Sequence, residues 1–102
     1  MNADTNIQVW LETAARTPPG IIIPYVRTSQ DKTLRYQVRA VRRGPAGRSM
    51  LSQGGVVEAQ AGVPAALGRM SFNYGPADDC NIDLILSEHG SDDRNYHFAC
   101  PD

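Results

Sequence analysis

Turn-forming residues recur along this chain at intervals too short for a series of helices. Clusters rich in Gly, Pro, Ser and Asp interrupt it at residues 17–20, 29–31, 44–47, 61–64, 75–79 and 88–93. These residue types adopt or preset the backbone angles of tight turns. Between the clusters, apolar and polar side chains alternate with a period of two, which is the pattern of a half-buried strand. The spacing therefore predicts an all-β chain.

The segments between the turns predict seven strands, and none of them is long enough to contain a crossover helix. We place the strands at 6–13, 20–28, 33–42, 50–60, 66–74, 80–87 and 94–100. Short strands joined without crossovers pair antiparallel and pack as two sheets. The expected fold class is therefore an immunoglobulin-like antiparallel β-sandwich of about seven strands. A chain of 102 residues supports one domain, which we expect at residues 6–101 after a flexible N-terminal segment at 1–5.

The alternation in the strand at 33–42 indicates which side chains face the core. In the strand at 33–42, one set of residues alternates with another: Leu34, Tyr36, Val38 and Ala40 against Arg35, Gln37, Arg39 and Val41. We expect the first set to pack and the second to face solvent. In the strand at 20–28, Pro24 follows an apolar run. Because proline has no N–H for a ladder, that strand is expected to lie at a sheet edge or to be bulged there.

The two cysteines fall on the last two predicted strands. If residues 80–100 form a hairpin about Gly90, Cys80 lies directly opposite Cys100, just as Ile82 lies opposite Phe98. Opposed cysteines at a non-hydrogen-bonded pair are close enough for a disulfide. We therefore expect a Cys80–Cys100 disulfide, which implies an oxidising compartment. The alternative is a pair of buried free thiols.

The charges are distributed unevenly, although the formal net charge is only −1. Residues 1–50 contain eight basic and three acidic side chains, a balance of +5. Residues 51–102 contain two basic and eight acidic side chains, a balance of −6. If the basic half forms one face, the molecule is an electrostatic dipole that steers a charged partner.

The basic stretch is the candidate partner-binding surface. Nine of the ten bases in the chain are Arg, which favours planar, multidentate contacts. The candidate residues are Arg27, Lys32, Arg35, Gln37, Arg39, Arg42 and Arg43. The alternative is a solvated sheet face that binds nothing. Nucleic acid is not an expected partner, because no exposed aromatic residues interleave with the arginines and the acidic second half repels phosphate.

No motif points to catalysis, a metal or a cofactor. The hairpin register sets Asp83 opposite His97, which suits an exposed charge pair better than half a metal site, because no third ligand has suitable spacing. The segment 44–49 has the glycines of a phosphate loop but lacks the lysine and the following helix, so it predicts a hairpin turn. No apolar run has the length of a membrane span. We expect a monomer that is neither an enzyme nor a membrane protein and that needs no cofactor.

Three segments carry a family resemblance: Ile23-Pro24 with its polar turn, the run Arg35–Gly44, and the run Ala66–Asp79, which ends in Pro-Ala-Asp-Asp. Together they resemble the CsgC-like curli amyloid inhibitors, and within that family the CsgH branch. The resemblance covers residues 20–100, and strand order and turn positions agree with it. The CsgC branch has a C-x-C pair in the strand that matches 32–34. Both cysteines are absent here, so a thiol-exchange role does not carry over.

The resemblance implies an immunoglobulin-like sandwich in the bacterial periplasm that keeps curli subunits from nucleating amyloid before export. The basic residues listed above suit a transient, electrostatically steered contact with such a subunit. A function from a different class stays open, namely a periplasmic or secreted adhesion or scaffold module that uses the sandwich as an interaction platform.

Overall fold

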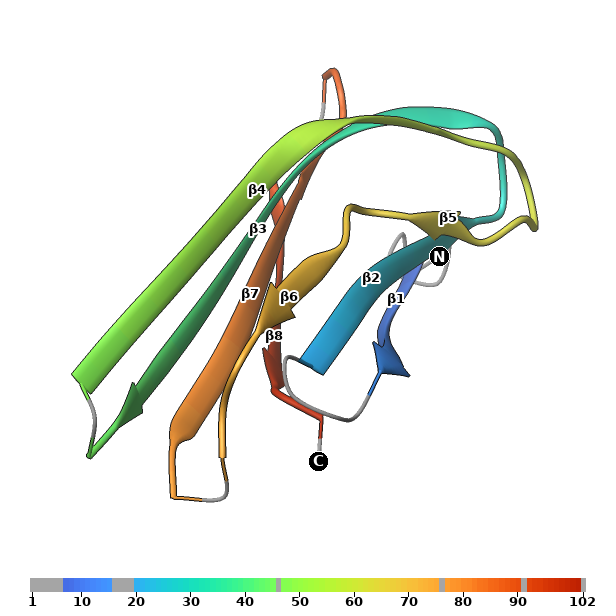
Figure 1. Ribbon diagram of the computed structural model, residues 1–102. Helices are drawn as coiled ribbons and strands as arrows, with labels where there is room; N and C mark the ends of the chain where they lie inside the picture. The colour runs from blue at the N-terminus through green and yellow to red at the C-terminus, as the bar shows by residue number, and fades with distance from the viewer. Residues whose placement is uncertain (1–6, 16–19, 46, 76, 91, 102) are drawn as a thin grey trace.

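Two antiparallel sheets form the layers of the molecule (Figure 1). The computed structural model describes residues 7–15, 20–45, 47–75, 77–90 and 92–101, so the segment expected to be flexible at 1–5 lies outside the described residues. Sheet A contains β1 (Ile7–Ala15), β2 (Gly20–Thr28), β5 (Ala65–Ala66) and β6 (Met70–Phe72), and β2 is its central strand. Sheet B contains β4 (Gly47–Ala59), β3 (Lys32–Gly44), β7 (Asp79–Ser87) and β8 (Arg94–Ala99), in that spatial order.

The strand pattern confirms the prediction of an all-β sandwich. Each predicted strand has a counterpart, and the one expected at 66–74 is divided into β5 and β6. The strands β3 and β4 are longer than expected, because their pairing continues up to the hairpin that Gly44 and Gly47 close. The segment 44–49 is therefore a hairpin turn with its flanking residues, as the missing lysine and helix predicted.

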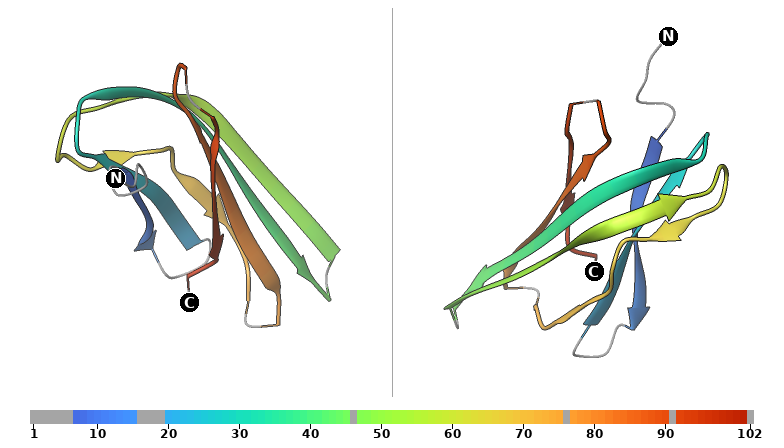
Figure 2. Two further views of the ribbon diagram at one scale, coloured as in Figure 1. Left: turned by 180° about the vertical axis from the view of Figure 1, so that it is seen from behind. Right: turned by 90° about the horizontal axis from the view of Figure 1, so that it is seen from above.

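The core lies between the two sheets, whose strands cross at an angle when viewed from above (Figure 2). It is built from inward-facing aliphatic residues of both sheets: Ile7, Ile22, Val26, Leu34, Val38, Ala40, Leu67, Met70, Ile82, Leu84 and Leu86. The inward set predicted for β3 is confirmed, with Tyr36 only partly buried. Burying one such aliphatic side chain stabilises the fold by about 1.5–3 kcal/mol, so the period-two pattern supplies the main driving force for this architecture.

Pro24 lies in the middle of β2, a central strand paired on both sides. The expected edge position is therefore wrong, and the irregularity lies in the neighbouring segment. There, β5 pairs with Tyr25 and Val26, whereas β6 pairs with residues 20–22 in a register shifted by one residue. The missing N–H of Pro24 removes a ladder bond at this point, so the partner strand breaks and accommodates one extra residue.

Gly68 lies in this break and provides a test of it. Its φ is +91°, and an added Cβ would approach Gln53 Oε1 to 2.7 Å. Gly62 also has a positive φ, +74°, but a Cβ there would meet nothing within 4 Å. We predict that Gly68→Ala lowers the free energy of unfolding by about 1 kcal/mol more than Gly62→Ala, because it disturbs the hydrogen bond from Gln53 Nε2 to Arg69 O. Urea unfolding of both variants measures the difference, and equal losses would contradict the prediction.

Candidate functional site

The solvent-facing side of sheet B, called the outer face below, carries four of the predicted binding residues. Arg35, Gln37, Arg39 and Arg43 are exposed at outward positions of β3, and the outward position between Arg39 and Arg43 is occupied by the half-buried Val41. Because β3 lies between β4 and β7, this row runs through the middle of the sheet and not along its edge. The outward orientation predicted from the alternation is therefore confirmed.

The neighbouring strands complete the outer face. Each residue of the row has one partner on β4 and one on β7: Arg35 lies between Val56 and Ser87, Gln37 between Gly54 and Ile85, Arg39 between Ser52 and Asp83, and Arg43 between Arg48 and Asp79. Val56 is 61% exposed, so the face offers apolar as well as polar contacts. This combination of guanidinium, amide and aliphatic groups suits an uncharged or weakly acidic extended chain.

Two shallow hollows lie next to each other on the outer face. One is lined mainly by residues of β3, β7 and β8, including Arg39 and Asn95, and the other by residues of β3, β4 and β7, including Arg35 and Gly54. Gln37 and Ile85 line both. Gly54 has no side chain, so the surface is lower beside Gln37 and a backbone can approach the sheet there.

The sequence reasoning missed the apolar part of this surface. Ile85 is an apolar residue at an outward position, between the inward-facing Leu84 and Leu86. Val56 is likewise outward on β4. The signal was present as an apolar residue out of phase with the alternation of its strand, but it gains meaning only once the register places Ile85 beside Gln37.

The charge on the outer face is mixed. Arg39 lies opposite Asp83 and Arg43 lies opposite Asp79, because the acidic strand β7 pairs with the basic strand β3. The condition for a simple dipole, a basic half that forms a face of its own, is therefore not met. Because basic and acidic side chains lie next to each other, the outer face attracts a charged partner only over short distances.

Three of the predicted binding residues lie away from the row. Lys32 and Arg42 occupy inward positions near opposite ends of β3, and Arg27 lies on sheet A. Lys32 Nζ donates to Glu88 Oε1 at 2.9 Å, and its side chain is only 19% exposed. The grouping of all seven residues in one patch is therefore not supported by their placement, because side chains at even-numbered positions of β3 point toward the other sheet.

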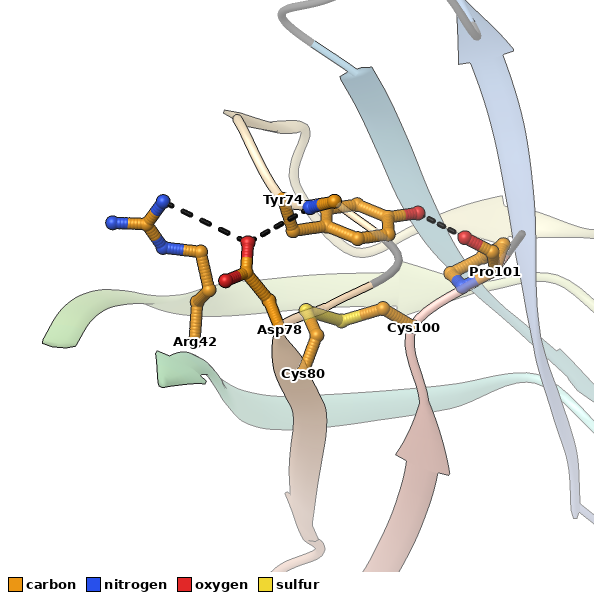
Figure 3. The surroundings of a disulfide bond; sticks show 7 residues. Arg42, Tyr74, Asp78, Cys80, Cys100 and Pro101 are labelled. Atoms are coloured by element: carbon orange, nitrogen blue, oxygen red, sulfur yellow. Dashed lines mark hydrogen bonds and ion pairs between the residues drawn. A yellow bond between two sulfur atoms is a disulfide. The ribbon is translucent and has the colours of Figure 1, made fainter. Parts of the chain in front are cut away.

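Arg42 belongs to a polar corner at the end of the sandwich (Figure 3). It donates to Ser49 Oγ at 2.8 Å and forms an ion pair of 3.9 Å with Asp78. Asp78 also accepts a hydrogen bond of 2.8 Å from the Gly75 N–H, and the Tyr74 hydroxyl donates to the carbonyl oxygen of Pro101. These contacts tie the loop before β7 to the β3–β4 hairpin and to the C-terminal segment.

The Asp83–His97 pair is present as the hairpin register predicted. His97 Nδ1 lies 2.6 Å from Asp83 Oδ1, and both side chains are more than half exposed. Within the described ranges, no three His, Cys, Asp or Glu side chains gather as a metal site would require. That part of the chain also contains no helix long and apolar enough to span a membrane.

Cys80 and Cys100 form a disulfide, which confirms the predicted pairing (Figure 3). The two cysteines lie directly opposite each other, as the hairpin register predicted, and they do so at a hydrogen-bonded pair. The Cys100 N–H donates to Cys80 O at 3.1 Å, and the Cα atoms are 5.4 Å apart, which is the spacing of a hydrogen-bonded pair. That spacing is still within the range of a disulfide, so the bond forms while the backbone pairing continues past the end of β8.

We predict that removing this bond, by reduction or by Cys80→Ser with Cys100→Ser, lowers the free energy of unfolding by about 3 kcal/mol. The estimate follows from the entropy that the closed loop removes from the unfolded chain, here with a sequence separation of 20 residues. Urea unfolding with and without reductant measures it, and the double serine variant must be insensitive to reductant. Two alkylatable thiols in the folded, non-reduced protein would contradict the bond itself.

Comparison with known proteins places the chain in a family. The E. coli curli protein CsgC has 27% sequence identity and a TM-score of 0.76, over 90% of this chain and 97% of that chain. R. palustris CsgH shares the fold at 22% identity and a TM-score of 0.73, over 91% of each chain. No curated protein sequence matches. The family model Tafi-CsgC, described as thin aggregative fimbriae synthesis protein, matches residues 1–95, and the chain therefore belongs to this family.

Proposed function

We propose that this protein is a periplasmic, chaperone-like inhibitor that keeps amyloid-forming curli subunits from nucleating. The family description concerns the synthesis of thin aggregative fimbriae, and the similar E. coli structure is of a curli protein. Both findings support a curli-associated role. The inhibition of nucleation is the part of the function that we propose. The exposed row of Arg35, Gln37 and Arg39 on the outer face is the observation that carries it.

The spacing of this row fits an extended polypeptide. Consecutive outward residues of β3 are about 6.8 Å apart, which is also the repeat of same-side residues on an extended partner. A polar side chain of the partner therefore meets a guanidinium or amide at each repeat. Ile85, beside Gln37, adds an apolar contact. An early amyloid nucleus presents such extended polar segments before its own strands are paired.

The mixed charge of the outer face favours brief contacts. Exposed ion pairs contribute at most about 1 kcal/mol each and are screened by salt. Asp83 lies opposite Arg39 and Asp79 lies opposite Arg43, so these carboxylates reduce the positive potential of the face. Binding is therefore expected to be fast, weak and salt-sensitive, so that one inhibitor encounters many subunits. The disulfide supports an oxidising compartment such as the periplasm.

The direct experiment adds the protein at substoichiometric amounts to a curli subunit and follows thioflavin fluorescence. We expect a longer lag time, with the effect reduced at high salt because the steering is electrostatic. An unchanged lag time would refute the proposal. A stable stoichiometric complex with a folded partner would instead favour an adhesion or scaffold module.

A charge reversal tests the proposed surface. We predict that Arg35→Glu with Arg39→Glu lowers the inhibitory potency about tenfold or more, because the variant loses the electrostatic steering of the row. The matched control is Arg27→Glu with Arg69→Glu, which makes the same change in net charge at exposed positions away from the outer face. Both variants are first checked for unchanged unfolding. Equal potency of the two would place the active surface elsewhere.

A further inference from the structure

The strand β4 forms an unusually open edge of sheet B. Within the described part of the chain its backbone pairs with β3 alone, and Figures 1 and 2 show it at the outside of the sheet. Its thirteen residues pair with β3 in one unbroken register. The nine residues 49–57 contain no charge and no proline. Natural sheets usually protect an edge with a charge, a proline or a bulge, so this central stretch is free to accept another strand.

The outward side chains of β4 are complementary to themselves. In order along the strand they are Arg48, Met50, Ser52, Gly54, Val56 and Glu58. Taken in pairs that are equally far from Gln53, they are a basic and an acidic residue, two large apolar residues, and two small residues: Arg48 with Glu58, Met50 with Val56, and Ser52 with Gly54. If a second copy aligns antiparallel with Gln53 opposite its own equivalent, each of these pairs comes together across the junction.

The exposed apolar residues fit this alignment. Met50 is 58% and Val56 is 61% exposed, and a single chain covers neither of them. The antiparallel alignment sets Met50 of each copy opposite Val56 of the other, twice in the dimer. Two of the most exposed large hydrophobic side chains among the described residues are thereby removed from water together.

The charges at the ends of β4 fit it as well. Within one chain Arg48 lies directly opposite Arg43, and Glu58 lies opposite the uncharged Thr33. Like charges that face each other across two strands are unfavourable. The second copy would bring its Glu58 to the other side of Arg48. Across the junction, Arg43 and Arg48 of one copy are then followed by Glu58 and Thr33 of the other.

From this pattern we infer that the protein forms a weak two-fold dimer through antiparallel pairing of β4 with β4 of a second copy. The two four-stranded B sheets then form one continuous eight-stranded sheet. This replaces the monomer expected from the sequence, where the edge position of β4 was not visible. The dimer places two copies of the Arg35–Gln37–Arg39 row on one surface, which provides two adjacent binding rows for an extended partner.

A charge exchange at the strand ends tests the dimer. Sedimentation equilibrium at low ionic strength, over protein concentrations up to the solubility limit, is expected to show a monomer–dimer equilibrium. Arg48→Glu alone and Glu58→Arg alone each place like charges together twice in the dimer, so each is expected to weaken dimerisation about tenfold or more. The double variant Arg48→Glu with Glu58→Arg restores opposite charges and is expected to recover the wild-type dissociation constant.

The monomer fold tolerates these changes. Arg48→Glu faces Arg43 in its own chain, which is an attraction, and Glu58→Arg faces Thr33. Arg27→Glu, an exposed charge change on sheet A, is the control that leaves dimerisation unchanged. A wild-type protein that is monomeric at every concentration would overturn the inference, as would a double variant as weak as the single variants. The readout needs no curli subunit, so its failure is separate from failure of the proposed function.

Discussion

The pairing of β3 with two neighbours is the constraint on which the rest of this molecule depends. The strand β3 pairs with β4 at thirteen residue positions and with β7 at nine, in two continuous antiparallel ladders. Because both ladders share one strand, a shift of one residue in β3 would turn Leu34 and Val38 outward and Arg35 and Arg39 into the core. The burial of the aliphatic set therefore holds the arginine row on the surface, and the candidate site is a direct consequence of the core.

Polar contacts and the disulfide hold the loops at the two ends of the sandwich. At one end, Lys32 is paired with Glu88. At the other end, Asp78 accepts a hydrogen bond from the Gly75 N–H and forms an ion pair with Arg42. The disulfide there joins β7 to the segment after β8. The inward-facing basic residues Lys32 and Arg42 thus stabilise loops, whereas the outward-facing Arg35 and Arg39 are exposed to a partner. The role of a basic residue on this strand therefore depends on which face of the sheet it occupies.

The outer face combines features that suit recognition of an extended chain without permanent capture. Gln37 and Ile85 lie at its centre, where two hollows meet, and Gly54 leaves the backbone accessible. On either side of Gln37, Arg39 lies opposite the carboxylate Asp83, whereas Arg35 lies opposite the uncharged Ser87. A self-complementary β4 edge next to this surface would extend it across two copies. Family membership supports a curli-associated role, and this surface is where the proposed contact with a subunit would form.

The sequence by itself determined the local features. The period-two alternation indicated the strands and the buried side of β3, and the symmetry of the last hairpin about Gly90 set Cys80 opposite Cys100 and Asp83 opposite His97. These follow from the chain because alternation and hairpin register are relations between residues close in sequence. Only the tertiary structure decided which distant strands are neighbours. It placed the acidic β7 beside the basic β3, gave β2 and its Pro24 a central position, and left β4 at an edge. Those outcomes depend on how two sheets cover a common core, and no local pattern in the chain encodes that arrangement.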